Sequence, residues 1–385
     1  GYTSNNTGVT AIGYQALKVS VADYNTAVGL NAGVATTSGT VDAFGAGALA
    51  ANTTGAANSA FSRDALNANT TGSENTAIGR QALGLNTTAS NNTAVGYQAG
   101  YANTTGAENT SVGWKALTSN TTGQYNSAFG LGSLQLNTTA SYNSGSGQQS
   151  LFANTTGANN TAQGYRALFS NTTASNNTAV GYQAGYNNTT GDGLNFFGNG
   201  AGYSNTTGYA NAAFGSEALY SNTTGVSNTA LGGSALRSNT TANNNTAVGY
   251  QAGYSNTTGT ENVYIGQVAG YSNTTGSNNT FIGRYAGNFT TGGDNTFVGR
   301  ASGNAVTSGT KNVIIGRYDG NVDGVDIRTL SNYIVLSDGD GYPAFWGQGG
   351  SSGYMRLQAG RLEFPATQNA STNANTLDDY EEGTF

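Results

Sequence analysis

Large apolar residues recur along this chain at one fixed place in a short repeat, not at the spacing of an amphipathic helix. Most copies contain a segment such as Asn-Thr-Ala-Val-Gly, in which the apolar residue stands directly before the glycine. With this glycine as the anchor, the central units follow every 17 residues from Gly79 to Gly283. Units of 16 or 17 residues continue from Gly13 to Gly316, with Ser62 in one anchor position. About nineteen units in register indicate a repeat protein.

The length and residue types of the unit predict an all-β fold, a parallel β-solenoid. Seventeen residues are too few for a helix pair, and Asn, Thr and Gly are weak helix formers. The segment Asn-Thr-Thr-Gly, first at Asn52, supplies turn residues, and its Gly can take a positive φ. We expect each unit to form one rung of two brief strands and two turns, hydrogen-bonded to the next rung.

The strand before each anchor is apolar on both sides. The residue before the anchor is usually Ile, Val, Phe or Leu, with Ser146 and Gln163 as exceptions, and the residue two before it is usually Ala. Successive strand residues point to opposite faces. If the larger residues fill the narrow interior, the alanines lie outside and pack against another chain. This predicts a self-assembly face that contains Ala94, Ala179, Ala247, Tyr264, Phe281 and Phe297.

The last four units change this position from small to bulky. It holds Tyr264, Phe281, Phe297 and Ile314. Bulky side chains do not fit a gap shaped for Ala without strain. We therefore expect the chains to move apart there or this face to meet another partner. The alternative is compensation within each rung.

A second apolar pair follows each anchor. Ala stands three residues after the anchor and usually precedes Leu, as in Ala82-Leu83. Where Gly replaces this Leu, a Tyr commonly follows, as at Tyr101, Tyr186, Tyr203, Tyr254 and Tyr271. We expect Leu and Tyr to alternate in filling one space. A surface stripe of these tyrosines that binds carbohydrate is the alternative.

Composition excludes several functions. The chain has no His and no Cys, which excludes a Ser-His-Asp triad, a Cys nucleophile, a disulfide and the usual zinc sites. Thirteen Lys and Arg over 385 residues do not build the dense positive surface that nucleic acid requires. The carboxylate pairs available to a glycosidase, such as Asp378 and Glu381, lie in a predicted linker. We expect no enzyme activity, no cofactor and no nucleic-acid partner.

Charge and hydropathy divide the chain into a long neutral part and an acidic end. Residues 1–318 carry ten basic and nine acidic side chains, whereas three Arg and ten acids follow from Asp319 onward. No apolar run is long enough to span a membrane. Because Gly1 falls inside a repeat and no initiator Met precedes it, we expect a further segment upstream.

Three regions follow from these patterns. Residues 1–318 form the solenoid shaft, 319–365 a small β-hairpin-rich C-terminal region, and 366–385 an acidic linker or junction. In the middle region, 333–336 and 343–346 are predicted strands around a turn at 338–341. A second hairpin is predicted from 354–357 and 361–364.

Other patterns suggest ligands or modification. The Asn-Thr-Thr segments match the N-glycosylation signal at Asn103, Asn120, Asn154, Asn188, Asn205, Asn222, Asn256 and Asn273. The alternative is a ladder of asparagines that hydrogen-bond between rungs. Asp338 and Asp340 are calcium candidates, although a hairpin turn explains them equally. Arrays of Thr on a flat solenoid can bind ice, but adjacent threonines in a turn point in different directions.

The Asn-Thr-Ala-Val-Gly units with a following Ala resemble the head repeats of trimeric autotransporter adhesins. Runs such as residues 92–100 are also similar to those of phage tail-fibre-like and environmental surface-fibre proteins. The resemblance implies a parallel β-roll in a homotrimer. We expect a non-enzymatic structural fibre or filament shaft outside the cell, on a cell surface or on a virion, with itself as partner. The alternatives are an adhesin or tail-fibre protein that recognises cell-surface glycans and, less favoured, an ice-binding solenoid.

Overall fold

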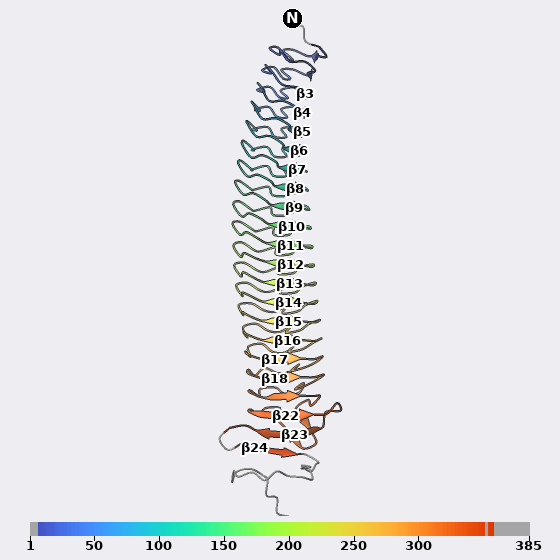
Figure 1. Cartoon of the computed structure of the whole chain (residues 1–385), viewed down its shortest axis with the longest axis vertical. Coiled ribbons are helices and arrows are strands. Elements are labelled where there is room, and N and C mark those ends of the chain that lie inside the picture. Colours follow the sequence, from blue (N-terminus) through green and yellow to red (C-terminus); the bar gives the residue numbers. More distant parts are fainter. Residues whose placement is uncertain (1–6, 351–352, 358–385) are drawn as a thin grey trace, which may run out of the picture.

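The computed structural model describes residues 7–350 and 353–357, and it shows a long all-β stack without a helix in these residues (Figure 1). The prediction of a parallel β-solenoid of about nineteen rungs is confirmed. The strand predicted at 361–364 and the linker at 366–385 lie outside the described residues.

Each repeat contributes one short strand directly before its anchor. The strands are β1 (Thr10–Ile12), β2 (Thr26–Val28), β3 (Val41–Phe44), β4 (Asn58–Phe61), β5 (Thr76–Ile78), β6 (Thr93–Val95), β7 (Thr110–Val112), β8 (Ser127–Phe129), β9 (Ser144–Ser146), β10 (Thr161–Gln163), β11 (Thr178–Val180), β12 (Asn195–Phe197), β13 (Ala212–Phe214), β14 (Thr229–Leu231), β15 (Thr246–Val248), β16 (Val263–Ile265), β17 (Thr280–Ile282), β18 (Thr296–Val298) and β19 (Val313–Ile315). Successive strands pair in parallel with equivalent positions opposite, as Ala77 is opposite Ala94.

The second predicted strand of each rung is instead a series of turns. Residues two and four after the anchor have left-handed backbones, such as Gln81 at φ 61° and Leu83 at φ 48°. This conformation costs a residue such as Leu about 1 kcal/mol. It persists because the Leu83 side chain is buried and its amide donates to the carbonyl of Ala99 in the next rung at 2.9 Å. Packing between rungs therefore overrides local preference in this half of the unit.

The anchor glycine is required by the close approach of successive backbones. Gly96 has a φ of 134°, and a Cβ added there would lie 2.5 Å from the carbonyl oxygen of Gly113 in the next rung. No side chain fits at that distance, which explains why Gly recurs at this position.

The interior contains the alanines, so the predicted assignment of the two strand faces is wrong. Ala94, Ala179 and Ala247 are completely buried within their own chain, as are Tyr264, Phe281 and Phe297. The apolar residues before the anchor point outward instead, and Ile78 is 44% exposed. The leucines of the turn half fill the interior and leave room only for small strand residues opposite them. These six residues therefore do not form a self-assembly face.

Bulky strand residues inside the core are compensated within their own rung. Phe196, Tyr264, Phe281 and Phe297 are each followed six residues later by Gly in place of Leu. A Cβ added at Gly287 would lie 2.5 Å from the Phe281 ring, and Gly270 and Gly303 contact Tyr264 and Phe297 in the same way. The predicted change of partner in the last units is wrong, because the aromatic ring occupies the space of the missing Leu.

The C-terminal strands continue the sheet of the shaft. β22 (Tyr333–Ser337) pairs in parallel with β19, β23 (Pro343–Gln348) pairs antiparallel with β22, and β24 (Tyr354–Leu357) pairs antiparallel with β23. The strands at 333–337 and 343–348 agree with the sequence pattern. β24 lies beside β23, so residues 354–357 extend the first hairpin to a third strand.

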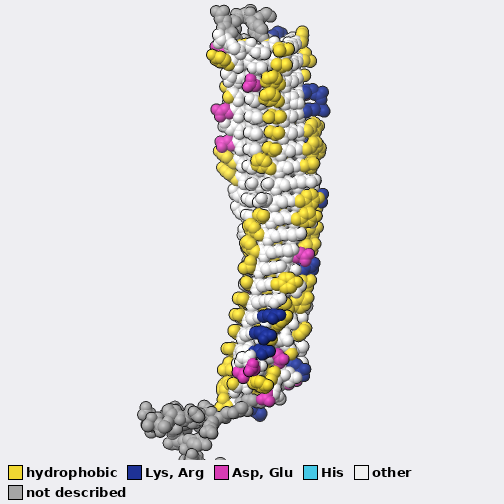
Figure 2. Space-filling model, turned by 90° about the vertical axis from the view of Figure 1, so that its right-hand side faces the viewer, with side chains coloured by type: hydrophobic (Ala, Val, Ile, Leu, Met, Phe, Trp, Pro, Cys, Tyr) yellow, Lys and Arg dark blue, Asp and Glu magenta, His cyan; other side chains and the backbone are white. Residues whose placement is uncertain are grey.

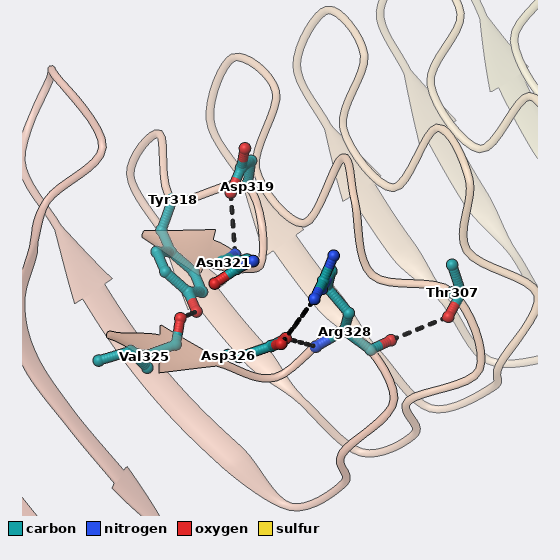
Figure 3. A network of polar contacts seen from close by, with 7 residues as sticks. All are labelled: Thr307, Tyr318, Asp319, Asn321, Val325, Asp326 and Arg328. Carbon is teal, nitrogen blue, oxygen red and sulfur yellow. Dashed lines mark hydrogen bonds and ion pairs between the residues drawn. The ribbon is translucent and has the colours of Figure 1, made fainter. Parts of the chain in front are cut away.

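A short hairpin closes the C-terminal end of the core. It consists of β20 (Asn321–Val322) and β21 (Val325–Asp326), which the sequence pattern did not predict. The buried Tyr318 hydroxyl donates to the Val325 carbonyl at 2.7 Å, and burial raises the pKa of Tyr318 (Figure 3). Arg328 pairs with Asp326 at 2.7 Å, while Thr307 donates to the Arg328 carbonyl at 3.1 Å. These contacts attach the hairpin to the last rungs.

Candidate functional site

The turn asparagines form a continuous ladder inside the shaft. From Asn69 to Asn256, each Nδ2 donates to the Oδ1 of the asparagine one rung earlier at 2.8–3.0 Å. The same Nδ2 also donates to a carbonyl of its own turn, as Asn103 does to Gly106 at 2.8 Å. Both amide protons of each ladder asparagine are thus engaged, as expected for a buried amide.

A second line of asparagines lies four residues before the anchors. The backbone amide of Asn75 donates to Asn58 Oδ1 at 3.0 Å, and Asn75 Nδ2 donates to the Ala89 carbonyl at 2.9 Å. The same pattern recurs in the following rungs, as at Asn109 and Asn126. The two lines of side-chain amides therefore connect each rung to its neighbours inside the shaft.

This ladder is incompatible with glycosylation at the predicted turn sites. The candidate residues are between 0% and 2% exposed: Asn103, Asn120, Asn154, Asn188, Asn205, Asn222, Asn256 and Asn273. A glycan on Nδ2 would replace a hydrogen bond and would have no path to solvent. The interpretation of a hydrogen-bonded ladder is confirmed.

The ladder changes partner at Tyr264. Asn273 Nδ2 donates to the Tyr264 hydroxyl at 2.7 Å, so the Oδ1 of Asn256 has no partner among the described residues. Burial raises the pKa of Tyr264, and the phenol is therefore held in its neutral form.

Asp338 acts as a turn residue. Its Oδ1 accepts hydrogen bonds from the backbone amides of Asp340, Gly341 and Tyr342 at 3.0, 2.8 and 2.9 Å. In residues 7–350 and 353–357, no three acidic, His or Cys side chains gather as metal ligands would. The geometry favours the turn interpretation over a calcium site at Asp338 and Asp340.

The turn threonines differ in their exposure. Thr104 Oγ1 donates to the Thr121 carbonyl of the next rung at 3.0 Å, and this bond repeats along the shaft. The following threonine, such as Thr105, is exposed. The turns thus present one column of free hydroxyls, not the two aligned columns that an ice-binding face requires.

Aromatic rings five residues after the anchors stack on one another outside the shaft. The rings of Phe169, Tyr186 and Tyr203 follow at centroid distances of 5.1 and 5.2 Å and are nearly parallel. Because each ring covers its neighbour, the ladder presents ring edges, whereas sugar rings stack on aromatic faces. The geometry therefore disfavours a carbohydrate stripe on these tyrosines.

The idea that Leu and Tyr alternate in one space is wrong. Leu168 lies in the interior, and Phe169, the next residue, stacks outside on Tyr186. The space beside Gly185 is filled by neighbouring rungs, because Leu168 and Phe196 come within 2.9 and 3.1 Å of an added Cβ. Leu and the ring that follows it therefore occupy two separate columns.

The outer face of the sheet carries an apolar stripe along most of the shaft. The stripe consists of the residues directly before the anchors, and the hydrophobic side chains form long columns on the molecule (Figure 2). Its most exposed members are between 36% and 61% exposed: Ile12, Phe61, Ile78, Phe129, Phe214, Leu231, Ile265, Ile282 and Ile315. Leu336 of β22 lies opposite Ile315 and continues the column. Polar residues interrupt it at Ser146 in β9 and Gln163 in β10.

The sequence contains evidence that the residues directly before the anchors point outward. Gln163 and Ser146 occupy the stripe position, and a long amide such as Gln without an assigned partner is poorly suited to a narrow core. The position two before the anchor is never charged in the central units. The inner position holds nothing more polar than Ser111, whereas the outer position holds the long amide of Gln163, and this difference marks the outer position.

The stripe ends at a hollow beside the C-terminal strands. This hollow, of about 420 Å³, is lined by Ile334, Gly347, Gln348, Gly349, Gly353, Tyr354 and Met355. Ile334 belongs to β22 and lies opposite Val313 of β19 on the outer face. The apolar surface is therefore continuous from the shaft onto the C-terminal strands.

Searches for related proteins gave no match, either to a protein-family model or to a curated protein. Within the described ranges, no helix has the length and apolar character needed to cross a membrane.

Proposed function

We propose that this chain is a structural fibre shaft, without enzyme activity, that assembles with copies of itself through the outer face of its sheet. The apolar stripe on that face is the observation that carries the proposal. Nineteen rungs at about 4.8 Å give a shaft on the order of 90 Å long. Each outward residue occupies about two residue rises of its strand, so the stripe is about 6.6 Å wide. Interrupted at Ser146 and Gln163, it covers roughly 500 Å², toward the upper end of apolar patches on monomers.

This area suits association between copies. Stable interfaces bury about 800 Å² on each partner, which the stripe and its flanking columns together can supply. A homotrimer, as in the adhesin repeats that the sequence resembles, would place three such faces around a common axis. A location outside the cell, on a cell surface or a virion, belongs to the same proposal and is supported by that resemblance.

The test compares exposed apolar residues inside and outside the stripe. The first variant combines Ile78→Lys, Phe129→Lys and Leu231→Lys, whose side chains are 44%, 45% and 48% exposed. The matched control combines Leu85→Lys, Leu136→Lys and Phe289→Lys, which are 43%, 39% and 52% exposed but lie six residues after their anchors. Both variants should keep the circular dichroism spectrum of the parent chain.

Light scattering then gives the assembly state. We expect the parent and the control to have three times the mass of one chain, and the stripe variant to have the mass of a single chain. A monomeric parent chain, or a stripe variant that assembles as well as the control, would contradict the proposal.

A further inference from the structure

The residues on the two sides of the stripe carry opposite charges. The residue directly after the anchor is never acidic and is Arg in five units: Arg63, Arg80, Arg284, Arg300 and Arg317. The residue five before the anchor is acidic in four units, Glu74, Glu108, Glu261 and Asp294, and basic only at Lys311. All of these residues are exposed, and basic side chains gather near the C-terminal end of the shaft in Figure 2.

The residues five before the anchors form one column, at the start of the strands, and the residues directly after the anchors form another, at their end. On the arginine side, the Arg80 guanidinium lies 5.7 Å from the ring centroid of Tyr97, the equivalent residue of the next rung. On the acidic side, the rings of Tyr125 and Tyr142 stack at 4.9 Å, and the Glu108 carboxylate raises the pKa of Tyr125. Five residues lie between the two positions, and three of them form the strand, so the columns are at most about 20 Å apart. The columns therefore lie on opposite sides of the stripe.

The two columns are not paired with each other within the chain. The ion pairs of the described residues are Arg63 with Asp64, Arg237 with Glu217, and Arg328 with Asp326. None of them joins an arginine after an anchor to an acid before a strand. Arg80, Arg300, Glu74 and Asp294 thus remain available for another chain.

The arrangement of charge distinguishes between two ways of packing these faces. If two copies point in the same direction, related by rotation about an axis along the shaft, the arginine side of one lies along the acidic side of the other at the same rung. This holds for two copies and for three. If the copies point in opposite directions, each side meets its own kind. Opposite charges therefore meet only in the parallel arrangement.

The apolar stripe alone does not fix the register of the copies. Neighbouring rungs are so similar that a slip by one rung leaves most of its contacts intact. The charged positions are irregular along the shaft, and only in exact register does Arg80 lie opposite Glu74 while Arg300 lies opposite Asp294. A slip by one rung would replace both pairs, because it places Arg63 opposite Glu74 and Arg284 opposite Asp294, so charge alone does not exclude it. Closure excludes it, since identical copies that are related by rotation alone around one axis lie at the same height.

We propose that copies of this chain align in parallel and in register, with ion pairs between chains from Arg80 to Glu74 and from Arg300 to Asp294. Copies align only if they assemble, so the alignment rests on the proposed function. One rung opposes it, because Arg317 would lie opposite Lys311.

Charge reversal tests the alignment. The one-sided variant combines Arg80→Glu and Arg300→Glu, which makes both sides of these rungs acidic. The full exchange adds Glu74→Arg and Asp294→Arg and restores opposite charges between parallel copies. The matched control, Arg63→Glu with Arg284→Glu, changes the same column where Ala57 and Asn278 would lie opposite. Circular dichroism checks that each variant is folded.

Sedimentation at low salt measures the dissociation constant of each assembly. We expect the one-sided variant to dissociate at about tenfold higher concentration or more, the control to change less, and the full exchange to recover most of the loss. If the parent assembles but the one-sided variant assembles equally well, or the full exchange stays as weak as the one-sided variant, the parallel alignment is wrong while the fibre proposal stands. A monomeric parent chain would refute both.

Discussion

The side-chain amide of asparagine determines how one rung is placed on the next. It combines two donors with an acceptor, so a single residue can bond to the rung before it, to the rung after it and to its own turn. Asn171 does all three, with Asn154, Asn188 and the Ala174 carbonyl as partners at 2.9–3.0 Å. Ser or Thr lacks the length and the number of donors for this role, which accounts for the recurrence of Asn.

Replacing one ladder asparagine should open the shaft locally. Asn171→Ala leaves one amide proton of Asn188 and the Oδ1 of Asn154 unpaired in a dry interior, at a cost of about 3 kcal/mol in the free energy of local opening. Asn187→Ala is the matched control, since it is partly exposed and Ala occurs at this position in other units. Its effect should stay within about 0.5 kcal/mol.

Native-state hydrogen exchange is the suitable measurement, because long repeat proteins do not unfold in one cooperative step. The amides of the rungs on both sides of Asn171 should lose protection together. Equal protection in the two variants would show that the ladder contributes no stability.

At the level of the element, the rung is a closed packing unit in which the strand and the turn share one small core. A rung holds either a small strand residue with Leu in the turn, as Ala213 with Leu219, or an aromatic strand residue with Gly, as Phe281 with Gly287. In some rungs both positions are small, as at Ala94 and Gly100, and there Leu83 of the neighbouring rung reaches into the space.

Exchange of the two residues of one rung should therefore be far less costly than either single change. Phe281→Ala leaves a cavity and should cost about 3–5 kcal/mol, while Gly287→Leu forces a side chain against the ring. The double variant reproduces the Ala and Leu pair, and Leu219 shows that Leu tolerates this left-handed position at φ 51°. We expect a favourable coupling energy of 2 kcal/mol or more, on the order of that between residues in contact.

Native-state hydrogen exchange of the amides around this rung, in the two single variants and the double variant, gives this coupling. Additive losses would mean that the two side chains do not compete for one space.

Sequence patterns predicted the repeat length, the strand before each anchor, the ladder of Asn52 and its equivalents, and the two strands around the Asp338 turn. They did not predict which face of the strand is buried, because this depends on the turn residues that follow the anchor. The strand is apolar on both faces, so its own residues do not reveal which face is inside. Which strand face is inside depends on the interior leucines of the turns, such as Leu83. The backbone of these leucines is in the left-handed conformation, and contacts with the rungs above and below hold it there. The hairpin at Tyr318 was missed for a similar reason, since its strands are only two residues long.

At the level of the whole molecule, the core is continuous except at one place. Buried apolar residues form one cluster from Ala16 to Ala99 and a second from Ala116 to Val335. Between them, Gly100 replaces the interior Leu and Ser111 replaces the interior Ala. Because rungs contact only their neighbours, one weak interface divides the stability of the stack.

We expect the rungs before Gly100 to unfold in a separate transition at lower temperature. Restoring the usual residues with Gly100→Leu and Ser111→Ala should join the two clusters and raise that transition by several degrees. Differential scanning calorimetry of the parent and the double variant measures the effect. A single transition in the parent chain would show that hydrogen bonds alone couple the two parts.

Because all rungs pair in the same backbone register, removal or duplication of repeat units in the gene can change the length of the molecule. Removal or duplication of one 17-residue unit joins two equivalent positions, so the ladder, the core and the outer stripe continue across the new junction. Residues 92–101 and 177–186 are identical in sequence and five units apart. One recombination event between such copies would shorten or lengthen the shaft by about 24 Å without creating a new packing problem. The length of the solenoid can therefore change by whole rungs, independently of whatever its two ends contact.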